Sequence, residues 1–379
     1  MPVQEMLMLT KKMWGVAAAV ATTLAFGFHV AAQSTPTPAR ALLVLEKDTT
    51  QLDIIDPNSL KIVAKVPVGP DPHEVIASAD GKTAYVSDYM GRGGMHHILT
   101  VIDLVAQKPL EPIDLGALEA PHGLDFIGGE LYFTAEGAKA IGRYNPATRK
   151  IDWIMGTGED RTHMVWVSKD LTKIVTSNVA SGTVSIIEQV QQAGPPGPPP
   201  GAGPGGQRGP QGPPSGFGGQ KTWEVTDVPA GRGSEGFDVS PDGTQIWTAN
   251  AQDNTATIID FAAKKDITTF PISVRGANRL KFTPDGKYVL ISGLGAGPGG
   301  GSSGGPNAVV IDAATHKEIR QLDLGGGSAG ILMDPVGDRA FVAVSGGNKV
   351  AVINLRNFTV TGYIAPLAQP DGMAWAVRH

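Results

Sequence analysis

The chain of 379 residues contains no cysteine. Without thiols it can form no disulfide, attach no haem covalently and use no thiolate nucleophile. It also lacks an excess of basic charge, because 31 Lys and Arg stand against 36 Asp and Glu. Nucleic acid is therefore not an expected partner. The Gly-rich runs carry no lysine and do not resemble a phosphate-binding loop, whereas a noncovalently bound cofactor stays open.

The N-terminus has the three parts of a secretory signal. Lys11-Lys12 precedes an apolar run over residues 13–30, and small residues follow at Val30-Ala31-Ala32. This pattern predicts a signal peptide over 1–32, a periplasmic or secreted protein, and no membrane contact after cleavage. A retained membrane anchor is the alternative, because the run has about the minimum length for spanning. Residues 33–40 are predicted to form a disordered lead-in.

A strand-like sequence motif that ends in an acidic or amide residue recurs seven times. Its copies are spaced about 42 to 47 residues apart, except for two longer intervals. Its anchors are Ile55-Asp56, Ile102-Asp103, Tyr144-Asn145, Ile187-Glu188, Ile259-Asp260, Ile311-Asp312 and Asn354-Leu355. A repeat of this length with strand patterning predicts one propeller blade per copy. We therefore expect an all-β, seven-bladed β-propeller over 41–379, with four antiparallel strands in each blade, and a monomer.

The two chain ends are predicted to share one blade. The ordered chain begins at a second strand, 41–45, and continues with 52–56 and 62–68, so an innermost strand is missing there. Residues 372–377 at the C-terminus supply it. This pairing closes the ring and removes the open edges that it would otherwise carry.

Several strands resemble a known repeat family. Ala84-Tyr85-Val86-Ser87-Asp88, Ile246-Trp247-Thr248-Ala249-Asn250 and Val350-Ala351-Val352-Ile353-Asn354 are similar to the YVTN-type β-propeller repeats of bacteria and archaea. The resemblance covers 41–379 and implies a seven-bladed, commonly exported protein. That family includes relatives of lactonases and of the haem d1 and copper propellers of denitrification, so the resemblance leaves the activity open.

Two inserts interrupt the repeats. Residues 189–220 contain collagen-like Gly-Pro-Pro triplets, which are too few for a triple helix and predict a flexible spacer. Residues 293–306 form a Gly-rich loop. The strand order places this loop and the segment 89–97 on one face, the top, and the collagen-like insert on the opposite face.

One column of the repeat alignment carries reactive side chains. At the starts of the seven inner strands it reads His73, His122, His163, Glu235, Asn278, Ala329 and Asp371. Because inner strands line the channel, these side chains are predicted to surround its mouth on the top face.

Two interpretations of this column stay open. The histidines could bind one divalent metal ion (Zn, Cu, Mn or Ca), with Glu235 or Asp371 as a fourth ligand or a general base. Alternatively, each His caps a neighbouring loop, as a structural device copied by duplication.

Other polar residues flank the column. Asn278, Arg279 and Arg161 are candidates for binding a carboxylate or phosphate of a ligand. Polar residues at the ends of the second strands are expected to form the turns that lead into the third strands. These residues are Asp88, Glu136, Asn178, Asn250, Ser292 and Ser345. The sequence thus predicts a scaffold that binds a small molecule or a protein at its top face. A metal-dependent hydrolase or lyase, similar to lactonases, is the alternative.

Overall fold

The computed structural model describes residues 35–91, 93–192, 221–295 and 305–378. The predicted signal peptide and most of the two inserts lie outside the described residues. Within the predicted lead-in, Thr37 is buried and its hydroxyl donates to the Leu104 carbonyl at 2.5 Å. Among the described residues, no helix has the length and apolarity needed to cross a membrane.

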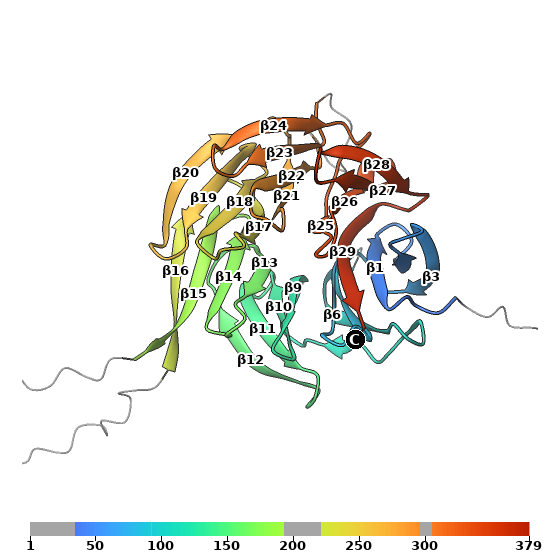
Figure 1. The fold of residues 1–379 in the computed structure, drawn as a ribbon. Helices are drawn as coiled ribbons and strands as arrows, with labels where there is room; N and C mark the ends of the chain where they lie inside the picture. The colour runs from blue at the N-terminus through green and yellow to red at the C-terminus, as the bar shows by residue number, and fades with distance from the viewer. Residues whose placement is uncertain (1–34, 92, 193–220, 296–304, 379) are drawn as a thin grey trace, which may run out of the picture. The chain divides into compact units, whose positions relative to one another are not determined.

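Seven antiparallel sheets form the blades of a ring (Figure 1), as the repeat predicts. Blade I contains β29 (Pro370–Val377), β1 (Arg40–Glu46), β2 (Gln51–Asp56) and β3 (Lys61–Pro67). Blade II contains β4 (Pro72–Ala77), β5 (Thr83–Gly91) and β6 (Gly94–Asp103), with its outer position shared by β7 (Lys108–Pro109) and β8 (Ile113–Asp114). Blade III contains β9 (Pro121–Ile127), β10 (Glu130–Ala135), β11 (Ala140–Asn145) and β12 (Lys150–Gly156).

The remaining four blades follow the same order from the channel outward. Blade IV contains β13 (Thr162–Val167), β14 (Lys173–Asn178), β15 (Thr183–Gln191) and β16 (Lys221–Pro229). Blade V contains β17 (Ser234–Val239), β18 (Gln245–Asn250), β19 (Thr255–Asp260) and β20 (Lys265–Pro271). Blade VI contains β21 (Ala277–Phe282), β22 (Tyr288–Gly293), β23 (Ala308–Asp312) and β24 (Lys317–Leu322). Blade VII contains β25 (Ile331–Met333), β26 (Arg339–Val344), the short 3-10 helix η1 (Ser345–Gly347), β27 (Lys349–Asn354) and β28 (Thr359–Ile364).

The predicted closure of the ring is confirmed. Strand β1 pairs with β2 on one side and with the C-terminal β29 on the other, with Leu42 opposite both Ile55 and Trp375. Figure 1 shows β29, in red, lying beside the blue β1. The two ends of the described chain are therefore held in one sheet.

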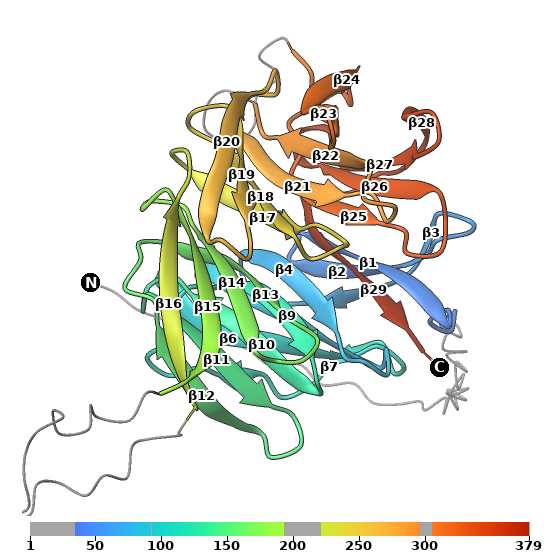
Figure 2. The same ribbon diagram turned by 60° about the vertical axis from the view of Figure 1, so that its left-hand side comes forward.

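Burial follows the position of each strand in its blade. The middle strands β1 and β2 are buried almost throughout, because neighbouring blades cover both faces. The outer strand β12 instead alternates between exposed and half-buried residues. Figure 2 shows β15 and β16 running side by side to the point where the described chain stops at 192 and resumes at 221.

Inner strands of neighbouring blades approach one another closely. A Cβ atom added to Gly123 would lie 2.5 Å from the carbonyl oxygen of His163 in the next blade, and one added to Gly236 would lie 2.6 Å from that of Asn278. Gly330 and Gly372 make the same contact with Asp371 and His73. Glycine at these positions therefore sets the separation of inner strands around the channel.

Candidate functional site

The seven positions of the alignment column line one cavity of about 250 Å³. Six of them are the second residue of an inner strand, and Ala329 lies just before β25. Tyr89, at the end of β5, and Ser345, in η1, lie in the same wall. The structure thus brings every candidate of the column together, along with Arg161 and Arg279.

Hydroxyl groups of the second strands fix the backbone of this column. Thr134 in β10 donates to the carbonyl oxygen of His163 at 2.7 Å and accepts from the Gly123 amide at 2.8 Å. Ser177 and Ser292 donate in the same way to the carbonyls of Glu235 and Ala329 in the blades that follow. The walls of the cavity are therefore held by bonds between blades, which makes their geometry rigid.

His163 lies between two carboxylates. Its Nδ1 hydrogen-bonds to Glu136, and its Nε2 lies 2.8 Å from Oε2 of Glu235. Burial lowers the pKa of His163, but the charges of Glu235 and Glu136 outweigh burial and raise the pKa above its ordinary value. The two carboxylates therefore favour the protonated form of His163. Its Nδ1 is hydrogen-bonded to Glu136, whereas Nε2 lies close to Glu235 without a well-aligned hydrogen bond.

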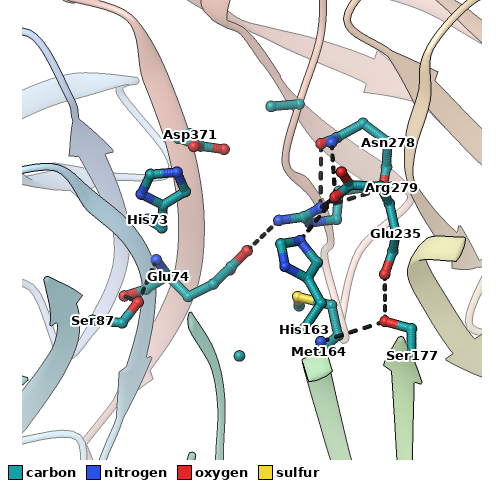
Figure 3. A network of polar contacts seen from close by, with 12 residues as sticks. His73, Glu74, Ser87, His163, Met164, Ser177, Glu235, Asn278, Arg279 and Asp371 are labelled. Atoms are coloured by element: carbon teal, nitrogen blue, oxygen red, sulfur yellow. Dashed lines mark hydrogen bonds and ion pairs between the residues drawn. The ribbon is translucent and has the colours of Figure 1, made fainter. Parts of the chain in front are cut away.

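Arg279 crosses the channel from blade VI to blade II. Its Nη2 donates to Oε1 of Glu74 at 2.7 Å, while Nη1 lies 3.5 Å from Oε2 of Glu235 and donates to Oδ1 of Asn278 at 3.3 Å. Figure 3 shows the guanidinium reaching toward Glu74. Arg279 is buried, so its guanidinium and these partners close the floor of the cavity.

His73 and His122 are neutral. The Lys47 ammonium, which has only donors, lies 2.7 Å from Nε2 of His73, so the Nδ1–H of His73 donates to the Asp71 carbonyl at 3.0 Å. Burial and then the Lys47 charge lower the pKa of His73. Burial and the His163 charge lower the pKa of His122 well below its usual value. Among the described residues, no group hydrogen-bonds to Nδ1 of His122, which is buried.

The geometry does not fit the predicted metal site. The rings of His122 and His163 lie over one another at a tilt, with centroids 3.6 Å apart and planes 32° apart. Imidazole lone pairs lie in the ring plane, so two rings that lie over one another do not direct their lone pairs at one ion. Nδ1 of His163 is hydrogen-bonded to Glu136, and within the described chain no group of three or more His, Cys, Asp or Glu side chains is arranged to hold a metal ion.

The two predicted bases are occupied by cations. Burial raises the pKa of Glu235, but His163 and Arg279 outweigh it and hold the pKa at about 2. A carboxylate with so low a pKa is a weak proton acceptor near neutral pH. Asp371 lies 3.2 Å from the Lys47 ammonium. The geometry therefore gives Glu235 a role in holding charge rather than in moving protons.

Sequence reasoning missed part of the network. Asn178 and Asn250 turn the strand corner as expected, since each donates to hydroxyls at the start of the third strand. Glu136 occupies the equivalent position but binds His163, the Tyr89 hydroxyl and Arg161, the last at 3.3 Å. Glu136 could have been identified because it is an acidic residue at the end of a second strand, a position that lies beside the histidines at the inner-strand starts.

Comparisons with known proteins indicate the fold alone. No protein-family model matches the chain, and no curated protein sequence matches it. A functionally unknown protein from Desulfotomaculum acetoxidans has a similar structure, with a TM-score of 0.65 at 11% identity over 89% of this chain and 99% of that one. A putative 6-phosphogluconolactonase from Bacteroides fragilis has a TM-score of 0.64 at 12% identity, over 90% and 99%. Hydrazine synthase from Kuenenia stuttgartiensis has a TM-score of 0.56 at 17% identity, over 76% and 78%.

Proposed function

We propose that this propeller binds a small organic anion in the cavity at the channel mouth. The exposure of the charged groups carries the proposal. Arg161 and Lys47 line the cavity with side chains that are 42% and 21% exposed, whereas its carboxylates, Glu235 and Asp371, are 15% and 10% exposed. A ligand that enters therefore meets accessible cations first, and these attract an anion.

His122 adds a requirement for a hydrogen-bonding group on the ligand. His122 lines the cavity and its neutral ring has one acceptor nitrogen, so a ligand hydroxyl that donates to this ring would gain about 0.5–1.5 kcal/mol. Because the carboxylates around His163 and Arg279 are already paired, the cavity needs little rearrangement before binding. These features favour a hydroxy acid over a simple carboxylate.

Binding can be tested by calorimetric titration with glycolate and malate, using glycolamide as the neutral match. We expect the acids to bind at least about tenfold more tightly than the amide, and Arg161→Gln to weaken acid binding by a similar factor. Arg232→Gln is the matched control, since Arg232 is exposed, pairs with Asp253 and does not line the cavity. Equal binding of glycolate and glycolamide, or no effect of Arg161→Gln, would contradict the proposal.

Membership of the YVTN-type repeat family and export are further parts of the proposal. They are supported by the strand motifs and by the pattern of residues 1–32. N-terminal sequencing of protein recovered from the periplasm or medium is expected to begin at Gln33. The alternative of a metal-dependent hydrolase or lyase has no support from the overlying rings of His122 and His163 or from the low pKa of Glu235.

A further inference from the structure

A second cavity of about 380 Å³ lies deeper in the channel. Later residues of the inner strands line it, among them the aromatic side chains of Trp166, Phe237 and Trp375. Arg279 lines both cavities, and no other residue of the described chain is common to their walls. The ion pair of Arg279 with Glu74 therefore lies where the two cavities meet.

The charges of this lower cavity do not balance. Arg279 pairs with Glu74 at 2.7 Å, and Lys281 pairs with Asp238 at 3.0 Å. Asp125 is the remaining charged group in the wall. Two cations and three carboxylates thus leave one negative charge facing largely apolar surroundings, which favours a cationic occupant.

Asp125 is held by the backbone instead of by a counter-ion. Its Oδ2 accepts from the Val167 amide of the next blade at 2.8 Å. Among the described residues, no lysine, arginine or histidine forms an ion pair with it. Burial raises the pKa of Asp125 to about 6, so the group is ionised above neutral pH.

We propose that the lower cavity binds a small organic ammonium ion, with its charge on the Asp125 carboxylate and its apolar body against Trp166, Phe237 and Trp375. A protonated amine donates to a carboxylate, and aromatic faces attract cations. The volume exceeds that of the upper cavity and lies at the lower end of the usual range for ligand sites. Apart from Arg279, the walls of this site differ from those of the proposed anion site, and so does its charge.

The probe is benzylamine, with benzyl alcohol as the neutral match and benzoate as the anionic one. We expect calorimetric titration at pH 7.5 to show benzylamine binding at least about tenfold more tightly than either match. Asp125→Asn keeps the size of the side chain and is expected to remove at least about nine-tenths of the affinity. Lys281→Met frees a second carboxylate, Asp238, and is expected to tighten benzylamine binding about threefold.

Control variants separate this site from the upper cavity. His122→Gln changes the upper wall alone and is expected to leave benzylamine binding unchanged, whereas Arg161→Gln tests the anion site without altering the lower one. The Lys281→Met result does not depend on whether Asp125→Asn folds well, because it is a gain in affinity. Equal binding of benzylamine and benzyl alcohol, no binding of benzylamine, or weaker binding by Lys281→Met would overturn the proposal.

Discussion

Replacing Glu74 by Gln is expected to destabilise the propeller, because it removes the main partner of a buried guanidinium. Arg279 then keeps only its 3.5 Å contact with Glu235 as an ion pair among the described residues. Breaking a buried ion pair at one partner costs about 3–5 kcal/mol. Because Arg279 keeps its contact with Glu235, we expect Glu74→Gln to lower the free energy of unfolding by about 3 kcal/mol, the lower end of this range.

Removing both partners is expected to cost much less than the two single changes together. Arg279→Met leaves Glu74 buried without its cation, again at about 3–5 kcal/mol, while Glu235 keeps His163. The double variant Glu74→Gln with Arg279→Met leaves neither charge of the pair without its partner. The coupling energy between Glu74 and Arg279 should therefore reach at least about 2 kcal/mol.

Thermal or denaturant unfolding of the four proteins measures this coupling. With about 2.1 cal/mol/K of unfolding entropy per residue, a loss of 3 kcal/mol lowers the Tm by about 4 °C for a domain of this size. Changes that add to within about 0.5 kcal/mol would refute the assignment of a cross-channel ion pair.

Four other outcomes follow from the structure. Glu235 has a folded pKa of about 2 against an ordinary value of 4.5, so its ionisation stabilises the fold above pH 4.5 and this stability is lost as the pH falls toward 2. Glu235→Gln should therefore reduce the dependence of the Tm on pH between pH 4.5 and 2. An unchanged dependence would contradict the charge network around Glu235. Gly123→Ala places a Cβ 2.5 Å from the backbone of the next blade and should cost about 2 kcal/mol by denaturant unfolding, whereas Gly156→Ala, which enters open space, should change stability by under about 0.5 kcal/mol. Deleting residues 372–379 removes most of β29 and should abolish cooperative melting; a truncated form with the wild-type Tm would disprove closure. Dialysis against EDTA should leave the Tm and acid binding unchanged, and a loss of either would revive the metal hypothesis.

The fold could be predicted because its information is repeated along the chain. Seven copies of a strand motif identify the blades, and the incomplete first copy, starting at 41–45, implied that the C-terminus completes it. These inferences need only the periodicity of the strands and the rule that exposed, unpaired strand edges are unfavourable. The predicted bounds of the strands in blade I lie within two residues of the observed ones.

The site could be predicted in position but not in chemistry. Aligning the copies placed His73, His122 and His163 at the strand starts, which the structure brings to one cavity. Whether neighbouring rings converge or lie over one another depends on the few ångströms between inner strands, which Gly123 and its equivalents set. The partners Glu136 and Glu74 come from other blades, so no local pattern indicates which nitrogen or guanidinium they bind.

The pairing of β1 with β29 has a consequence for when the protein can finish folding. The two strands are separated by more than 300 residues, so blade I stays incomplete until the last segment of the chain has been synthesised. A nascent chain can form local hairpins, but it cannot close the ring before β29 pairs with β1. The order of synthesis therefore delays the closed state until the final strand has been made.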